Sequence, residues 1–337
     1  MADVKVEEAA AGRNGDCVMA FLRENGIEEA VSLSMLSKCE RLGSTSVEQR
    51  IRPNWLYLQE IGVAKRKLPS VVSRCPQLLA LGLCQKLQPM VESLRGLGAS
   101  RAEVVRTVVR FPAVLAHNVE EKLCPLLAFL QAAGVKADNL GKIIFLCPRL
   151  LSYSIEKKLA PAVDYLSSIG VGKGVEMGRV IGHCPHILGY SVERRLQQTV
   201  LFLEGIGIKK DDLKKVAVFH PDILCRDANR TLRPALEFLR AQSFKPDQIA
   251  AMVARFPSIL IRSVTNSLRP KLEYLTREMG RQKEEVIDYP QYFGHNLQKI
   301  VVRHRTLSSQ SISVSLDKML SCNQKKFACT FCSRTLV

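Results

Sequence analysis

The sequence predicts an all-α protein, a curved α-solenoid of about seven helix-turn-helix repeats. A short X-Pro-x-x-Leu segment, ending in Phe in its last copy, recurs seven times along the 337 residues. Its prolines are 36, 36, 37, 36, 36 and 33 residues apart, and apolar residues on either side recur at helical spacing. Periods of roughly 20 to 50 residues are typical of stacked repeats, in which each unit contacts only its neighbours. The repeat anchors are Pro76, Pro112, Pro148, Pro185, Pro221, Pro257 and Pro290.

The first half of each repeat is expected to be a short amphipathic helix that ends at the anchor proline. In the third copy Asp138 opens this helix, and in the second copy Ser100 and Glu103 form a capping box at the same place. Pro148 ends the helix, because the residue before a proline is forced out of the helical region. A single tight turn follows the proline. The apolar side of the helix would consist of Leu140, Ile143, Ile144 and Leu146.

The second half of each repeat is expected to be a longer helix. Ser154, Ser191 and Ser263 occupy matching positions and are suitable N-caps. Gly170 ends the helix as a C′ glycine, because glycine adopts the left-handed conformation that this position needs. Matching glycines are Gly98, Gly134 and Gly207, whereas Ser243 and Met279–Gly280 depart from the pattern.

A second proline follows the anchor by 13 residues in most copies, and the fourth copy has Gln198 there. A proline inside a helix removes one hydrogen bond, so we expect a kink at this position and a consistent curvature of the stack. Curved stacks present a concave face that can hold a long partner. These prolines are Pro89, Pro125, Pro161, Pro234 and Pro270.

Three segments are expected along the chain. Residues 1–15 are small and polar and are predicted to be disordered. Residues 16–320 form the solenoid, in which Trp55 to Gly62 resembles the second half of a repeat without its first half and would cap the stack. Residues 321–337 are a Cys-containing tail of uncertain structure. No run of 18 apolar residues occurs, so we expect no contact with a membrane.

The charge of the chain is unevenly distributed. The net charge is +17, but residues 1–50 contain 6 Lys and Arg against 9 Asp and Glu, so the remaining residues have a net charge of +20. A strongly basic repeat array is typical of a surface that binds a polyanion, since Lys and Arg neutralise phosphates. The alternative is a charged surface that only keeps the protein soluble.

The 11 cysteines are odd in number and scattered, which indicates a reducing compartment rather than a disulfide framework. Cys75, Cys147 and Cys184 share one repeat position with Phe111 and Phe256, which predicts a buried apolar slot. The N-terminus contains acids and few arginines, unlike a transit peptide.

The repeat resembles that of the mTERF family, the mitochondrial transcription termination factors, and most of all a plant organellar member. The resemblance rests on X-Pro-x-[Leu/Ile]-Leu, then [Lys/Arg]-Leu-x-Pro, an aromatic-Leu pair and a glycine at a period near 36, over residues 17–327. It implies two α-helices and a short 3₁₀ turn in each unit. It also implies double-stranded nucleic acid as partner, a role in transcription termination or organellar RNA maturation, and a location in chloroplasts or mitochondria.

The candidate nucleic-acid-binding residues are basic and lie near the start of each second helix. Charges that repeat at one structural position fall on one face of a stack and can follow a phosphate backbone; the alternative is that they only solvate the helices. The candidates are Lys86, Lys122, Lys158 and Arg195 in one slot, Lys157, Arg194 and Arg230 one residue earlier, Arg233 and Arg269 two residues later, and Arg226 and Arg262 in the slot that Tyr153 and Tyr190 occupy in earlier copies. The two tyrosines are interpreted as turn packing in preference to base stacking.

The sequence gives no sign of an enzyme, a cofactor or a metal centre. No phosphate-binding loop, nucleophile elbow or His-Glu-x-x-His motif is present. The pair Cys329 and Cys332, even with Cys322, falls short of the four ligands of structural zinc. His183 and His186 flank the fourth anchor and are interpreted as structural.

We therefore expect a monomer that binds duplex DNA of an organelle through its basic groove and thereby stops or modulates an RNA polymerase. The first alternative is a factor that binds structured RNA during maturation. The second alternative is a helical scaffold that binds proteins and uses its charge only for solubility.

Overall fold

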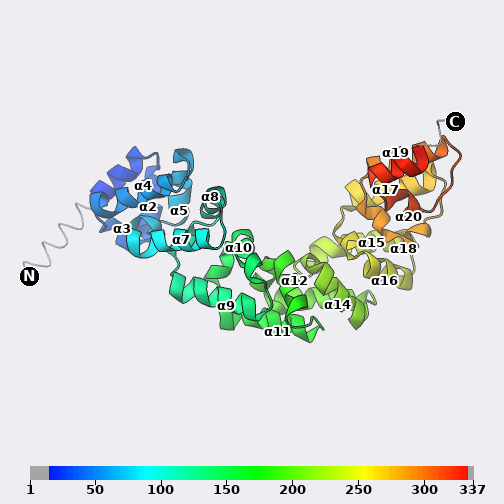
Figure 1. Cartoon of the computed structure of the whole chain (residues 1–337), viewed down its shortest axis with the longest axis horizontal. Coiled ribbons are helices and arrows are strands. Elements are labelled where there is room, and N and C mark those ends of the chain that lie inside the picture. The colour runs from blue at the N-terminus through cyan, green and yellow to red at the C-terminus, as the bar shows by residue number, and fades with distance from the viewer. Residues whose placement is uncertain (1–14, 333–337) are drawn as a thin grey trace, which may run out of the picture. The chain divides into compact units, whose positions relative to one another are not determined.

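The computed structural model describes residues 15–332, and the chain within that range is helical without any β-strand (Figure 1). It is divided into two compact units. Unit 1 extends to Ala160 and includes Lys173–Gly189, whereas unit 2 consists of Pro161–Gly172 and the residues from Tyr190 onward. The expectation that residues 1–15 are disordered falls almost entirely outside the described residues.

Unit 1 begins with a helix over residues 15–24. The elements that follow are α2 (Glu29–Lys38), α3 (Glu40–Gly43), η1 (Val47–Ile51), α4 (Arg52–Glu60), η2 (Lys65–Lys67), α5 (Leu68–Arg74), α6 (Gln77–Ala80), η3 (Leu83–Leu87), α7 (Gln88–Gly96), α8 (Arg101–Arg110), η4 (Pro112–Ala116), η5 (Val119–Leu123), α9 (Cys124–Ala132), α10 (Ala137–Leu146), η6 (Pro148–Ser152), η7 (Ile155–Leu159), α12 (Val175–His183) and η8 (Pro185–Gly189).

Unit 2 contains the remaining repeats and a terminal helical segment. Its elements are α11 (Ala160–Ser168), η9 (Val192–Leu196), α13 (Gln197–Gly205), α14 (Lys210–Phe219), η10 (Pro221–Ile223), η11 (Ala228–Leu232), α15 (Arg233–Ala241), α16 (Pro246–Arg255), η12 (Pro257–Ile261), η13 (Val264–Leu268), α17 (Arg269–Glu273), η14 (Tyr274–Glu278), α18 (Glu285–Asp288), η15 (Pro290–Gly294), α19 (Leu297–Ser308), α20 (Leu316–Leu320), α21 (Gln324–Phe327) and η16 (Ala328–Cys332).

The anchor segment forms the core of each repeat. Cys147 leaves the helical region with φ −137° and ψ 68°, as predicted for a residue before proline, and residues 148–152 form a 3₁₀ turn. Leu150 and Leu151 are buried, and the turns of consecutive repeats within a unit contact one another. The slot before the proline is buried at Cys75 and Cys184 and half-buried at the other anchors, so it is less enclosed than predicted.

Most of the predicted helix ends are confirmed, but α10 begins at Ala137, so that Asp138 lies in its first turn and does not open it. Ser100 and Glu103 form the capping box of α8. The side chains of Ser154, Ser191 and Ser263 each accept a hydrogen bond from a backbone N–H of the next turn. The C′ glycines have positive φ angles between 88° and 100°, and Ser243 takes the same region with φ 59°. The glycines are Gly98, Gly134, Gly170 and Gly207.

The second proline lies inside the second helix as predicted, but a π-helical turn precedes it. The second helices that precede α19 begin with a π-helical turn of five residues, and the proline is the second residue of the α-helical part that follows, as for Pro125 in α9. The wider turn, in which the N–H of Leu123 donates to the Asn118 carbonyl, accommodates a residue without an N–H. Gln198 follows the same π turn, so the turn does not require proline.

The repeat that contains Trp55 has a first half, contrary to the prediction from sequence. Cys39 ends α2 with φ −142° and ψ 82°, which is the backbone geometry of the proline anchors, and Leu42 is buried in the turn that follows. Glu40 stands where later repeats have proline. The proline pattern therefore missed this repeat, because the backbone geometry survives without proline.

One residue of the first helices is placed differently from the prediction. Leu140, Ile143 and Ile144 are buried in α10 as expected, but Leu146 is 59% exposed. It lies in the last turn, next to Cys147, where the chain leaves the helix.

The C-terminal segment packs on α19 through one buried arginine. Arg303 is 1% exposed, and its Nη1 donates to the carbonyls of Met319 (2.8 Å) and Cys322 (3.0 Å). Its guanidinium lies 4.4 Å from the centre of the Phe327 ring. The tail, uncertain from sequence, is thus part of unit 2 as far as the described residues extend.

Candidate nucleic-acid interface

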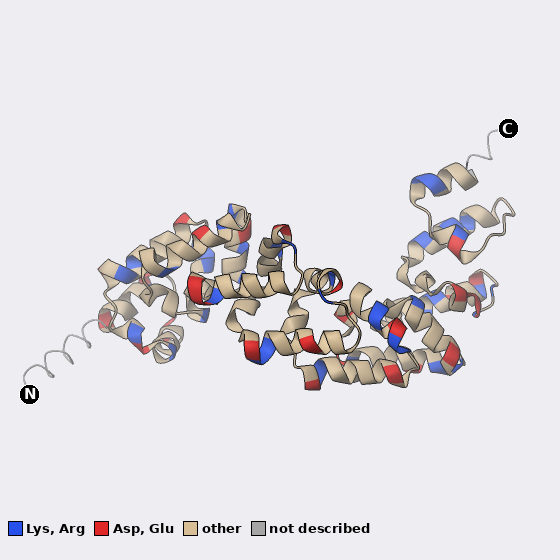
Figure 2. Ribbon diagram, turned by 60° about the horizontal axis from the view of Figure 1, so that its bottom comes forward, with Lys and Arg blue, Asp and Glu red and all other residues tan. Residues whose placement is uncertain are grey.

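Basic residues are distributed over both units and lie among acidic residues (Figure 2). Of the predicted ones, Lys86, Lys122, Lys157 and Lys158 belong to unit 1, and the seven arginines belong to unit 2. Most lie in the first turn of a second helix, where a positive charge opposes the helix dipole. Their position therefore does not stabilise the helices, which leaves ligand binding or solvation as the reason for the charge.

The N-cap of each second helix fixes where these side chains leave the backbone. The Oγ of Ser154 accepts from the N–H of Lys157 at 3.1 Å, and that of Ser191 accepts from Arg194 at 3.2 Å. The Oδ1 of Asp227 accepts from the backbone N–H of Arg230 at 3.0 Å. The same turn geometry thus repeats with a basic residue at or next to the N3 position.

Four of the predicted arginines meet around one polar cavity in unit 2, which we call the arginine pocket. Its volume is about 380 Å³, and it lies between the start of one second helix (η9 and α13) and the start of the next (η11 and α15). It is lined by Arg194, Arg195, Arg226 and Arg233, together with Gln198, Thr199, Leu201, Phe202, Asp227, Ala228 and Asn229. With four arginines and one carboxylate, the pocket is strongly positive and suits a phosphate group.

Arg233 is held in place without losing its charge. Its Nε and Nη2 donate to the amide oxygen of Asn229 at 3.1 and 2.8 Å. Its guanidinium lies 5.9 Å from the centre of the Phe202 ring, within the range of a cation–π contact. Because the partner oxygen is neutral, Arg233 remains a full positive charge with a fixed direction.

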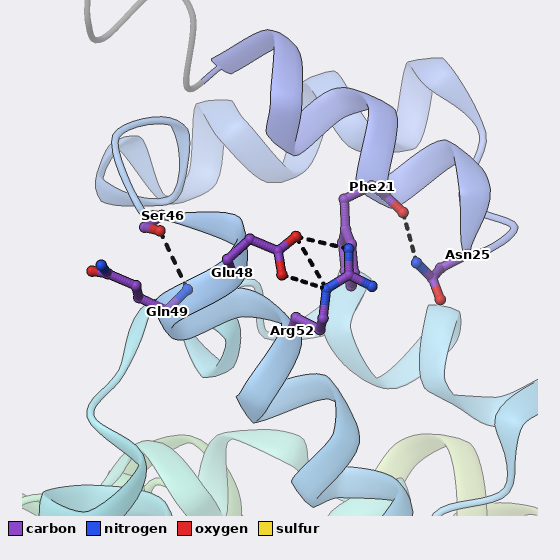
Figure 3. Close-up of polar contacts among 6 residues, drawn as sticks. All are labelled: Phe21, Asn25, Ser46, Glu48, Gln49 and Arg52. Atoms are coloured by element: carbon purple, nitrogen blue, oxygen red, sulfur yellow. Dashed lines mark hydrogen bonds and ion pairs between the residues drawn. The ribbon is translucent and has the colours of Figure 1, made fainter.

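The first repeat has the same arginine–phenylalanine stack, but there a carboxylate compensates the charge of the arginine. Arg52 lies 5.4 Å from the Phe21 ring centre, and its Nη2 and Nε donate to the carboxylate of Glu48 at 2.9 and 3.0 Å (Figure 3). The hydrogen bond and the negative charge of Glu48 raise the pKa of Arg52. Both arginines are held by the residue four positions earlier, but only Arg233 offers an uncompensated charge.

Arg269 makes the same kind of contact with a phenylalanine ring in a later repeat. Its guanidinium lies 5.6 Å from the centre of the Phe238 ring, and Thr265 stands four positions earlier. All three phenylalanines precede their arginine by 31 residues. This spacing is visible in the sequence and could have identified the stacks, whereas the basic slots alone do not reveal the phenylalanines.

Arg195 is partly compensated. Its Nη1 lies 2.9 Å from Oδ2 of Asp227, and its guanidinium is 6.0 Å from the Tyr190 ring centre. Hydrogen bonding from the N–H of Arg230, and secondarily the contact with Arg195, holds the pKa of Asp227 below its usual value. Arg194 and Arg226 are exposed in the same pocket.

An equivalent cavity in unit 1 is smaller and less basic. Its volume is about 260 Å³, and Lys122 lines it together with the acids Glu121 and Glu156. Tyr153 lines the cavity as well, and a Cβ on Gly189 would lie 2.8 Å from its ring, so the ring packs against the backbone of the next turn. This contact supports the interpretation of Tyr153 as turn packing.

The structure thus brings Arg194, Arg195, Arg226 and Arg233 together. Lys86, Lys157, Lys158, Arg230, Arg262 and Arg269 lie in their predicted repeat positions but do not line either of these two cavities. Asn229, Asp227 and Phe202, which orient or compensate the arginines, were not predicted from the sequence. None of the helices between residues 15 and 332 combines the length and apolarity that a membrane span needs.

The fold and these slots define an all-α protein of paired-helix repeats with basic residues at repeated positions. A family model described as mTERF matches residues 10–177 and 134–328. The chain therefore belongs to the mTERF family. It is also similar to Transcription termination factor MTERF6, chloroplastic/mitochondrial, of Arabidopsis thaliana, with 46% identity over 50 residues. That stretch covers 14% of this chain and 15% of the relative.

Proposed function

We propose that this protein binds duplex DNA of a chloroplast or mitochondrion through its repeated basic positions and thereby terminates or regulates transcription. The arginine pocket is the observation that carries this proposal, because four arginines line it with one carboxylate among them. The protein acts as a monomer, by occupying the duplex in front of an RNA polymerase rather than by catalysis. The name of the Arabidopsis relative supports both the process and the compartment.

Phosphates supply most of the affinity in this proposal. The forked guanidinium of Arg233, fixed by Asn229, suits two oxygens of one phosphate. Each neutralised phosphate releases bound counterions, so the binding constant falls steeply with salt. Preference for one DNA site then comes from a few base contacts or from the ease with which that sequence deforms.

The proposal is tested by fluorescence anisotropy with three ligands of one organellar sequence: duplex DNA, a structured RNA and single-stranded RNA. We expect duplex DNA to bind best, with a slope of log K against log salt of about −0.9 for each phosphate contact. The quadruple change of Arg226, Arg233, Arg262 and Arg269 to Glu should abolish binding while the far-ultraviolet circular dichroism stays the same.

The other outcomes are equally informative. A preference for the structured RNA would make RNA maturation the function and would overturn the DNA assignment. Absence of nucleic-acid binding at low salt would contradict both the DNA-binding and the RNA-binding function. A protein-binding scaffold would then be the remaining function. Unchanged affinity of the quadruple variant would place the nucleic acid on another face of the repeats.

A further inference from the structure

A second basic surface lies on the first helices of unit 1, away from the basic slots of the second helices. Two grooves flank α8. One, of about 350 Å³, extends to α10, and the other, of about 710 Å³, extends back to Gly62 and Lys67. Arg106 and Arg110 line both grooves, so the grooves meet over the ridge of α8. We call this surface the α8 face.

The floor of the α8 face is apolar. Phe145 and Leu146 line the groove toward α10, and Val105 and Val109 line the groove on the other side. Leu146 is 59% exposed although it belongs to a core-facing helix. Single exposed apolar residues are ordinary, but apolar residues gathered in adjoining grooves indicate a binding surface.

The rim of the α8 face is positive. Its cations are Lys67, Arg101, Arg106, Arg110 and Lys142. The acid in these grooves, Glu103, accepts from the N–H and Oγ of Ser100 at 3.0 and 2.7 Å, and these hydrogen bonds lower its pKa. The charge of Glu103 is therefore used to cap α8, and the surface has a clear excess of positive charge.

Two of the rim arginines are fixed by contacts between repeats. Nη2 of Arg110 donates to the carbonyls of Phe145 and Leu146 at 2.6 and 2.5 Å, and Nε of Arg101 donates to the carbonyl of Ile61 at 3.3 Å. The guanidiniums keep their charge, because their partners are backbone carbonyls. A ligand therefore meets a positive rim, of which these two arginines are fixed in direction, around an apolar floor.

We propose that the α8 face binds an acidic amphipathic helix of a partner protein, with one bulky apolar side chain in each groove. The positive rim selects acidic residues, and the two grooves select two apolar anchors. The anchors must straddle α8, whose diameter with side chains is about 10 Å, and residues seven positions apart on a helix are separated by about the same length. A nucleic-acid duplex fits less well, because a phosphate backbone leaves the apolar floor uncovered.

The test uses the full chain and a fluorescein-labelled helical peptide with two leucines seven positions apart and glutamates on its remaining exposed positions. We expect saturable binding by anisotropy, and loss of binding when both peptide leucines are replaced by serine. Leu146→Ser and Arg106→Glu should each weaken binding roughly tenfold, the loss expected when one buried apolar or charged contact is removed. Both residues are exposed, so the fold should survive, which circular dichroism checks.

Arg240→Glu is the matched control, because it makes the same charge change at an exposed position of α15 in unit 2. It should leave peptide binding unchanged. Equal binding of the serine peptide, or equal loss in the Arg240 variant, would reduce the interaction to non-specific charge attraction and overturn the proposal. A loss of duplex affinity in Arg106→Glu would assign the α8 face to nucleic acid instead.

Discussion

Arg233 is stacked on Phe202 of the preceding second helix, with its guanidinium carbon 5.9 Å from the ring centre. The same contact joins Arg52 to Phe21. The two stacks differ in the residue that holds the arginine from four positions earlier: an amide in Asn229 and a carboxylate in Glu48. One repeated packing contact therefore carries a free charge in unit 2 and a compensated charge in unit 1.

Replacement of these two arginines should separate packing from ligand binding. Arg233→Ala should lower duplex affinity and reduce the magnitude of the salt slope by about 1, because one phosphate contact is lost. Arg52→Ala removes the same side chain and the same ring contact but no free charge, so duplex affinity should stay within about twofold of the parent. A salt titration of both variants checks this. Equal losses would show that the stacks act through the fold rather than through charge.

The charge of Arg233 can also be compensated while its side chain is kept. Asn229→Asp places a carboxylate where the amide oxygen now accepts from Nε and Nη2, as Glu48 does for Arg52. Duplex affinity and the salt slope should fall nearly as far as in Arg233→Ala, whereas Asn229→Ala should have a smaller effect. Asn229 is exposed, so thermal stability should change little. Parent-like binding of Asn229→Asp would mean that Arg233 does not contact phosphate.

Two glycines of α12 should respond in opposite ways to alanine. A Cβ on Gly178 would lie 1.9 Å from the carbonyl oxygen of Gly134, so Gly178→Ala must push α12 away and should destabilise the protein by about 1–3 kcal/mol. A Cβ on Gly182 meets nothing within 4 Å, so Gly182→Ala should stabilise it by about 0.5–1 kcal/mol. Urea unfolding measures both. Stabilisation by Gly178→Ala would contradict the close approach of the two backbones.

The last repeat should lose stability in acid. Burial, and then the charges of Lys299, Arg303 and Lys271, lower the pKa of His295 from 6.5 to about 4, and its Nε2 lies 2.9 Å from the hydroxyl of Tyr289. The unfolded chain therefore binds more protons between these two values, so stability falls as the pH drops from about 6.5 toward 4.

His295→Gln removes this titration, so its urea midpoint should depend less on pH over that interval. The imidazole resonances of His295 in the parent should titrate well below 6 by NMR. A His295 that titrates near 6.5 would show that the ring is more open to solvent than its contacts indicate.

Much of the repeat could be predicted because its signals are local. The residue before each anchor proline leaves the helical region for steric reasons, Ser154 caps a helix through its own hydroxyl, and Gly170 adopts a positive φ that other residues avoid. The π turn ahead of Pro125 was not predicted, because the missing N–H permits either a kink or a widened turn. The repeat at Cys39 was missed, because its anchor has Glu40 instead of proline.

The interface could be predicted only as a set of positions. Repeat spacing placed Arg194, Arg226 and Arg233 near the starts of two consecutive second helices, and the pocket between these helices brings them together. Whether the charge of a given arginine is compensated depends on an acidic residue close to it in space, as Asp227 is to Arg195. Repeat spacing alone does not reveal that acidic residue. The expected curvature of the whole stack and the single groove along it stay predictions.

The sequence by itself determined the all-α repeat, its period and its helix ends, because proline, serine caps and glycine act on the backbone within a few residues. Tertiary structure decided what each charged or apolar side chain does. Packing of one repeat on the next left Leu146 exposed and joined Arg233 to Phe202. These outcomes depend on distances between residues some 30 or more positions apart, which only the packed repeats define.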